Sequence, residues 1–158
     1  MASFTLEEIE KATGASLLQK GEDAFVEGVS TDTRTISRGE LFIALIGENF
    51  NGHEFLKRAV LSGASAVMIS DASYGKNIDA HVSVFLVKDT KKGLEDLAHF
   101  HRMRFHVPVI GVTGSNGKTT TKDMITSILR TRFHVTATEK NFNNEIGLSM
   151  TLLSMTAE

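Results

Sequence analysis

The chain has 158 residues, of which 41% are apolar and 23% are charged, and its formal net charge is −2. This composition is typical of a folded globular protein and excludes a fibrous or intrinsically disordered one. Cysteine is absent, which excludes disulfides, zinc–thiolate sites and a cysteine nucleophile.

Charge and hydropathy narrow the range of partners. The sequence has no run of 18 apolar residues, and its acidic first eight residues lack the apolar core of a secretory signal. We therefore expect a cytoplasmic protein without a membrane span. Residues 81–158 carry 10 Lys and Arg against 7 Asp and Glu, a modest surplus that suits phosphate binding. Because these cations are not interleaved with aromatic residues, no nucleic-acid partner is predicted.

Predicted helices and strands alternate in the first half of the chain. Thr5 and Glu8 form a capping box that begins a short helix, and Gly14 ends it. A second helix begins after Asn51 and ends at Gly63. Its predicted buried stripe consists of Phe55, Leu56, Ala59 and Val60. Strand-like runs lie at 24–29, 41–45, 66–69 and 82–87. This alternation predicts a small α/β domain with an at least partly parallel sheet.

Five consecutive polar side chains follow the first strand-like run. They are Ser30, Thr31, Asp32, Thr33 and Arg34. Such clusters usually satisfy the backbone of a turn, and the spacing of Asp32 and Arg34 alone favours a local salt bridge. The other interpretation is that the arginine fork and the nearby hydroxyls contact a diphosphate.

The pattern changes at residues 88–90, where a long helix is predicted from Thr90 to Arg104. We place a domain boundary there, with one domain over 1–88 and a second over 89–158. Only two candidate strands, 109–113 and 133–137, lie beyond the boundary, whereas a nucleotide-binding parallel sheet needs more. The second domain is therefore expected to be the beginning of a longer P-loop domain.

A glycine-rich turn after the apolar run 109–112 predicts a phosphate cradle. Its glycines let consecutive backbone N–H groups point inward, and the helix that follows adds its positive N-terminal end. The candidate phosphate-binding residues are Thr113, Gly114, Ser115, Asn116, Gly117, Lys118, Thr119 and Thr120. Lys118 would neutralise the outer phosphates of a nucleotide, and the Thr119 hydroxyl would hold Mg²⁺. The alternative is a Gly-Asn turn that only reverses the chain.

The motif departs from the general pattern G-x-x-x-x-G-K-[ST] because Val112 occupies the position of the first glycine. The order of strand, turn and helix nevertheless agrees with it. The helix is predicted to bury the stripe Met124, Ile125, Ile128 and Leu129.

Near the end of the chain, Asn141, Asn143 and Asn144 follow the strand predicted at 133–137. Asparagines of this kind are often turn formers, but here they are expected at the carboxyl side of the sheet, where ligands bind. We interpret them as polar contacts to a nucleotide or substrate. Glu139 and Glu145 are not assigned as metal ligands.

These motifs resemble those of the Mur ligases, the ATP-dependent amide-forming enzymes of peptidoglycan precursor synthesis. Residues 113–119 are similar to the variant P-loop T-G-x-N-G-K-[ST] of this family, in which Val112 is normal. Residues 30–34, 39–45 and 51–55 look like its N-terminal UDP-binding domain. Residues 141–147 with 150–153 are most similar to the members that add D-alanyl-D-alanine. Ser149 differs from them, since proline is usual there.

The resemblance implies a set of ligands and roles. ATP and Mg²⁺ would bind at 113–120, with Lys118 and Thr119 acting in catalysis. UDP-N-acetylmuramoyl-tripeptide would contact 30–34 and Asn141, Asn143 and Asn144. A family member phosphorylates the carboxylate of this substrate, and the amino group of D-alanyl-D-alanine attacks the acyl phosphate. The remaining metal and catalytic residues of the family are expected past residue 158, so the chain alone is predicted to be inactive.

Other functions stay open at this stage. The chain could belong to a ligase of the same superfamily that adds a different amino acid, or act as a UDP-sugar-binding module without catalysis. A GTPase-like switch is disfavoured because the sequence has no Asn-Lys-x-Asp motif.

Overall fold

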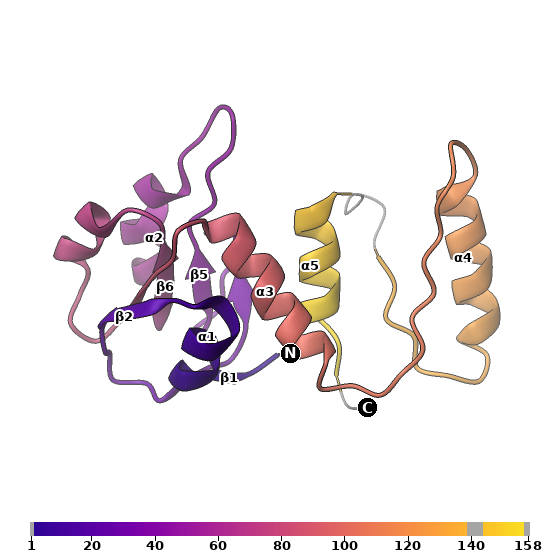
Figure 1. Cartoon of the computed structure of the whole chain (residues 1–158), viewed down its shortest axis with the longest axis horizontal. Coiled ribbons are helices and arrows are strands. Elements are labelled where there is room, and N and C mark those ends of the chain that lie inside the picture. The colour runs from indigo at the N-terminus through magenta and orange to yellow at the C-terminus, as the bar shows by residue number, and fades with distance from the viewer. Residues whose placement is uncertain (1, 139–143, 157–158) are drawn as a thin grey trace.

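The computed structural model describes residues 2–138 and 144–156. A five-stranded sheet forms the centre of the N-terminal lobe, which we define as residues 2–102 (Figure 1). Its strands, in spatial order, are β2 (Ser16–Gln19), β7 (Ser83–Leu86), β6 (Ala66–Ile69), β5 (Leu41–Ile43) and β4 (Val29–Ser30). Strands β4 to β7 are parallel, and β2 pairs antiparallel with β7 at one edge.

Helices cover both faces of this sheet. Successive residues of a strand point to opposite faces, so Leu41 and Met68 join one apolar cluster while Phe42 and Val67 join another. The first cluster lies against α1 (Leu6–Thr13) and α3 (Thr90–Arg102), and the second against α2 (Leu56–Leu61). A parallel sheet buried on both faces explains the continuous apolar runs in the sequence.

The predicted helix after Thr5 is confirmed as α1, with both hydrogen bonds of the capping box present and Gly14 left-handed at φ 65°. Residues 24–29 do not form one strand. β3 (Phe25–Val26) pairs antiparallel with β1 (Phe4–Thr5), and β4 alone enters the main sheet.

The helix predicted after Asn51 is present in two parts, η1 (Gly52–Phe55) and α2. Leu56 and Ala59 are buried and Val60 is partly buried, but Phe55 is exposed, which corrects the predicted stripe. The rest of the lobe contains η2 (Ala72–Asn77), between β6 and β7.

The two helices α3 and α5 (Glu145–Leu153) lie side by side and run in the same direction (Figure 1). The helix predicted from Thr90 is confirmed as α3, and its Leu94, Leu97 and Ala98 are buried in the core of the lobe. Leu153 of α5 joins the same core. Polar contacts occur at both ends of the pair: Lys91 forms an ion pair with Glu145, and His101 Nε2 donates to the Met155 carbonyl at 3.0 Å.

Residues 103–138 contain one helix, α4 (Lys118–Leu129), flanked by irregular chain. The strands predicted at 109–113 and 133–137 are wrong, since neither segment forms a β ladder with any described residue. The predicted burial along α4 is also wrong, because Met124 and Ile128 are exposed and no described residue of the helix is fully buried. Both predictions fail for the same physical reason. A strand needs a neighbouring strand to satisfy its backbone hydrogen bonds, and the apolar stripe of a helix needs a sheet to pack against. The described residues place neither beside this segment.

Within the described residues, no helix combines the length and the apolar character that crossing a bilayer requires.

Candidate substrate and phosphate sites

The polar cluster 30–34 lies at the carboxyl edge of the parallel sheet. β4 ends at Ser30 beside β5, so the segments after these two strands emerge at the same edge. Ser30 is buried, and its hydroxyl accepts from the Asp32 N–H at 3.2 Å and donates to the Asp32 carbonyl at 3.1 Å. The hydroxyl therefore fixes a tight turn directly after the strand.

Asp32 and Arg34 form a forked ion pair within this turn. Arg34 Nε donates to both carboxylate oxygens, at 2.9 and 3.0 Å, and the backbone N–H of Arg34 donates to Oδ1 at 2.9 Å. The hydrogen bond from the Arg34 side chain lowers the pKa of Asp32 to about 2. The local salt bridge predicted from the spacing is thus confirmed. The arginine side chain is still 76% exposed, which leaves its outer face accessible to an anion.

A second polar arrangement, which the sequence did not predict, ties neighbouring loops together at this edge. His53 is buried, and its Nε2 accepts from the Ser70 N–H at 2.9 Å, so Nε2 carries no proton. The other ring nitrogen, Nδ1, is therefore the donor to Asn51 Oδ1 at 2.7 Å. Burial lowers the pKa of His53, in agreement with this neutral form.

These partners occupy both ring nitrogens of His53, so its role here is to hold the turn after Asn51 against the end of β6. The signal available in the sequence was the Asn51 cap. The contact with Ser70, which is 17 residues away in the sequence, could be identified only from the folded structure.

The phosphate loop has the backbone expected of a cradle. Gly114 and Gly117 have φ of 148° and 78°, values that favour glycine, and Gly117 precedes the first turn of α4 without any side-chain cap. The N-terminal end of the helix is thus open toward the loop, the arrangement that suits an anion. Thr113, Ser115, Asn116, Thr119 and Thr120 are all exposed around it.

Lys118 folds back over this loop. Its ammonium donates to the carbonyl of Gly114 and, at 3.5 Å, to that of Ser115. For Lys118 to contact the phosphate oxygens of a nucleotide, its ammonium would have to leave these carbonyls.

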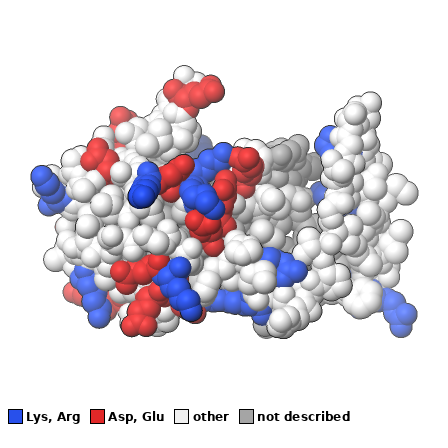
Figure 2. Space-filling model, in the orientation of Figure 1, with Lys and Arg blue, Asp and Glu red and all other residues white. Residues whose placement is uncertain are grey.

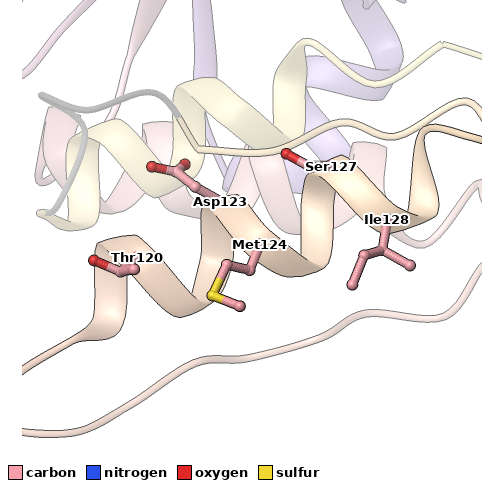
Figure 3. Close-up of a pocket in the computed structure, with 5 residues that line it drawn as sticks. All are labelled: Thr120, Asp123, Met124, Ser127 and Ile128. Carbon is pink, nitrogen blue, oxygen red and sulfur yellow. The ribbon is translucent and has the colours of Figure 1, made fainter.

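An open hollow of about 430 Å³ lies along α4, lined by residues of that helix alone (Figure 3). Met124 and Ile128 extend from the same side of the helix there. A hollow bounded by one helix does not enclose a ligand, and it does not contain the glycines of the cradle. We interpret it as the uncovered apolar flank of α4.

The described residues contain no group of three or more His, Asp and Glu side chains that could hold a metal ion. Asp123, one turn after Thr119 on α4, is the nearest acidic residue along that helix, and it forms an ion pair with Lys122. Glu145 is paired with Lys91, and Glu139 lies outside the described residues.

Of the three candidate asparagines, Asn141 and Asn143 lie outside the described residues. Asn144 caps α5, and its side chain accepts from the Gly147 N–H at 2.8 Å. The turn-forming interpretation is the one observed for this residue.

No hydrogen bond or ion pair among the described residues joins 30–34 to 113–120, and α4 stands at the opposite end of the molecule from β5 and β6 (Figure 1). On the face shown in Figure 2, acidic and basic side chains mingle over the N-terminal lobe, while the part around α4 carries few. The structure therefore presents two separate candidate sites.

An α/β lobe followed by a glycine-rich loop that opens a helix is an arrangement typical of P-loop proteins. Comparison with known protein families identifies a more specific class. Residues 25–102 match the catalytic domain of the Mur ligase family, and residues 112–158 match the Mur ligase middle domain. The chain belongs to the Mur ligase family, as its motifs indicated.

Individual proteins that are similar to this chain are also Mur ligases. The chain is 47% identical, over 85% of its length and 29% of the relative's, to the UDP-N-acetylmuramoyl-tripeptide–D-alanyl-D-alanine ligase of Bacillus subtilis. A crystal structure of MurF from Acinetobacter baumannii is 31% identical and covers 99% of this chain with a TM-score of 0.88, while the chain covers 34% of it. The MurF ligase of Thermotoga maritima in complex with ADP is 33% identical over 80% of this chain and 28% of its own, with a TM-score of 0.70. The chain spans about a third of the length of the curated relatives it matches.

Proposed function

We propose that the chain supplies the substrate-binding lobe and the ATP phosphate loop of a ligase that joins D-alanyl-D-alanine to UDP-N-acetylmuramoyl-tripeptide. The observation that carries the proposal is the presence of the polar strand end 30–34 and the loop 113–120 in one chain, which is 42–47% identical to relatives named for this reaction. The domain division at residues 88 and 89 stays part of the proposal.

In the proposed reaction, the γ-phosphoryl group of ATP passes to the terminal carboxylate of the tripeptide. The amino group of the dipeptide then attacks the acyl phosphate, an amide bond forms and phosphate leaves. Phosphoryl transfer of this kind depends mainly on positioning and charge neutralisation. Lys118 and the open N-terminal end of α4 suit the phosphates, and Thr119, in the first turn of α4, would hold Mg²⁺.

The fit to the metal is incomplete, since the described residues contain no cluster of three or more His, Asp and Glu side chains that could hold one. We assign Lys118 and Thr119 to binding of the nucleotide phosphates and derive no further step from the metal.

In the substrate lobe, Arg34 would donate to the diphosphate of the UDP group while Asp32 holds the guanidinium in place. Thr31 and Thr33 belong to the same turn and would offer hydroxyls to the nucleotide, while the buried Ser30 hydroxyl would hold that turn through Asp32. Asn141, Asn143 and Asn144 remain proposed substrate contacts, although the observed capping bond of Asn144 already uses its side-chain oxygen.

A second candidate function applies to the chain by itself: a UDP-precursor-binding module without turnover. The uncovered flank of α4 and the lysine folded onto its own loop favour it. The two proposals are compatible, since one concerns the ligase and the other concerns these 158 residues.

Calorimetric titration of the chain with UDP-N-acetylmuramoyl-tripeptide, and separately with Mg-ATP, tests both. We expect the UDP ligand to bind, Arg34→Ala to abolish binding, and the exposed Arg130→Ala to leave it unchanged. Mg-ATP is expected to bind weakly, and Lys118→Ala to remove that binding. Absence of UDP-ligand binding by the folded chain would contradict the substrate assignment.

A further inference from the structure

His101 is a buried histidine at the place where the C-terminal ends of α3 and α5 meet. It lies in the last turn of α3 and is only 4% exposed. Its Nε2 carries a proton, because the Met155 carbonyl 3.0 Å away can only accept a hydrogen bond. The other ring nitrogen, Nδ1, is buried and has no hydrogen-bond partner among the described residues. His101 is therefore neutral, with a bare lone pair on Nδ1.

Two aromatic rings pack against this side chain. Phe4 of β1 and Phe105, which follows α3, meet the His101 ring edge-on, with ring centroids 5.6 and 5.0 Å away. Neither ring carries an oxygen or nitrogen that could accept a hydrogen bond from Nδ1. The site suits the neutral ring, since a second proton would create a buried charge without a partner.

The charged groups on the neighbouring elements also favour the neutral ring. Arg104, in the segment after α3, lies over the Phe4 ring at 4.8 Å from its centroid. Glu8 is the carboxylate that α1 contributes here, but its Oε1 bonds Arg104 at 2.7 Å and its Oε2 accepts from the Thr5 N–H at 2.9 Å. Both oxygens of Glu8 are thus engaged, and the free charge beside His101 is a cation.

The two helices themselves add no carboxylate beside the ring. On α3, His99 is exposed, Arg102 donates to two backbone carbonyls of the segment that follows, and the last acidic residue is Asp96, more than one turn earlier. On α5, the charged residue is Glu145, at the opposite end of the helix, and residues 146–156 are all uncharged. A protonated His101 would therefore face no carboxylate from either helix.

Release of α5 is coupled to uptake of a proton by His101. Burial lowers the pKa of His101, and the positive charges of Arg104 and the amino terminus lower it further, while the bond to Met155 acts in the opposite direction. Once α5 moves away, water reaches the ring and its pKa returns toward the ordinary value of 6.5. The docked state is then fully stable above pH 6.5, and it loses stability as the pH falls below 6.5.

We propose that His101 is a pH-sensitive latch, which holds the C-terminal end of α5 on the N-terminal lobe when neutral and releases it when protonated. The latch goes beyond the proposed function, because it concerns the attachment of residues 144–156 and requires no ligand. Release would uncover Leu153, which is 5% exposed and belongs to the core of the lobe. It would also loosen the placement of Asn144, which begins α5.

Amide hydrogen exchange of the full chain at about pH 7 and about pH 5, corrected for the intrinsic rate at each pH, tests the latch. The protection of residues 149–153 should fall by up to about tenfold for each pH unit below 6.5, because opening takes up one proton. Residues 66–69 of β6 should remain better protected than 149–153 at both pH values, since α5 opens without the sheet. Equal protection of the two segments would contradict a local release.

Two glutamine variants assign the effect to one ring. His101→Gln keeps an N–H donor for the Met155 carbonyl but cannot gain a charge, so the protection of 149–153 should no longer depend on pH. His99→Gln is the matched control, because His99 is exposed on the same helix, and it should keep the loss seen in the parent chain. Protection that is independent of pH in the parent, or an equal loss in His101→Gln, would overturn the proposal.

A second measurement needs no variant. Nitrogen-15 chemical shifts of the histidine rings distinguish the two neutral tautomers and follow each ring through its titration. We expect His101 to carry its proton on Nε2 at about pH 7 and to titrate below 6.5. A proton on Nδ1 instead, or titration at 6.5 or above, would contradict the latch.

Discussion

The N-terminal lobe and the segment 103–138 both contain short apolar runs that predict strands, but these runs form a sheet only in the lobe. The apolar runs at 41–43, 66–69 and 83–86 are strands that pair with one another and are covered on both faces. The run Val109-Ile110-Gly111-Val112 is as apolar, but it forms no ladder and Val109 and Ile110 are exposed. The comparison shows that an apolar run becomes a strand only when a neighbouring strand satisfies its backbone.

The strongest way to test the comparison is to remove matched apolar side chains from the two regions. Leu97→Ala empties a fully buried site between α3 and the sheet, and it should lower the free energy of unfolding by about 2–5 kcal/mol. Ile128→Ala removes an exposed side chain from α4 and should change it by about 0.5 kcal/mol or less. Urea denaturation followed by circular dichroism measures both. Equal losses would show that α4 is packed as firmly as α3.

A smaller effect is expected from the ends of the helices. Thr5→Ala removes the capping box of α1, so it should cost about 1 kcal/mol, again by urea denaturation. Thr13→Ala, at the other end of α1, serves as a comparison because its hydroxyl bonds the Ile9 carbonyl instead of a first-turn N–H. A Thr5→Ala chain as stable as the parent would mean that α1 is held by packing alone.

The smallest effect concerns the ion pair of Asp32 and Arg34. The pKa of Asp32 is about 2 in the folded chain and near 3.8 when unperturbed, so the pair stabilises the fold above about pH 4. That contribution is lost as the pH falls from 4 toward 2, and solvent screening keeps it small.

Asp32→Asn should therefore flatten this part of the stability–pH curve slightly, whereas Asp23→Asn, at another exposed aspartate, should not. Thermal melts at pH 2 to 5 check it. An unchanged curve for Asp32→Asn would argue against the ion pair in solution.

The same contrast explains which features the sequence could predict. Continuous apolar runs identified β5, β6 and β7, and local spacing identified the Thr5 cap and the Asp32–Arg34 pair. β2 was missed because Ser16–Gln19 is a short, half-exposed edge strand with a weak pattern. Contacts between distant residues, such as His53 with Ser70, depend on the packing of whole elements.

In the phosphate loop and α4, local features were predicted correctly, but burial was not. Its glycines, its lysine and the helix after it were predicted from adjacent residues, and those local features are present. Burial of Met124 and Ile128 depended on a sheet that the described chain does not place beside them, so that prediction was wrong.

Amide hydrogen exchange across the chain tests the contrast between the two regions most directly. We predict that the amides of 41–43, 66–69 and 83–86 exchange only through global unfolding, while those of 109–113 exchange near the rate of an unstructured peptide. Protection of 109–113 comparable to that of the sheet would contradict the account, because it would mean that the strand before the phosphate loop forms without the neighbours we take it to need.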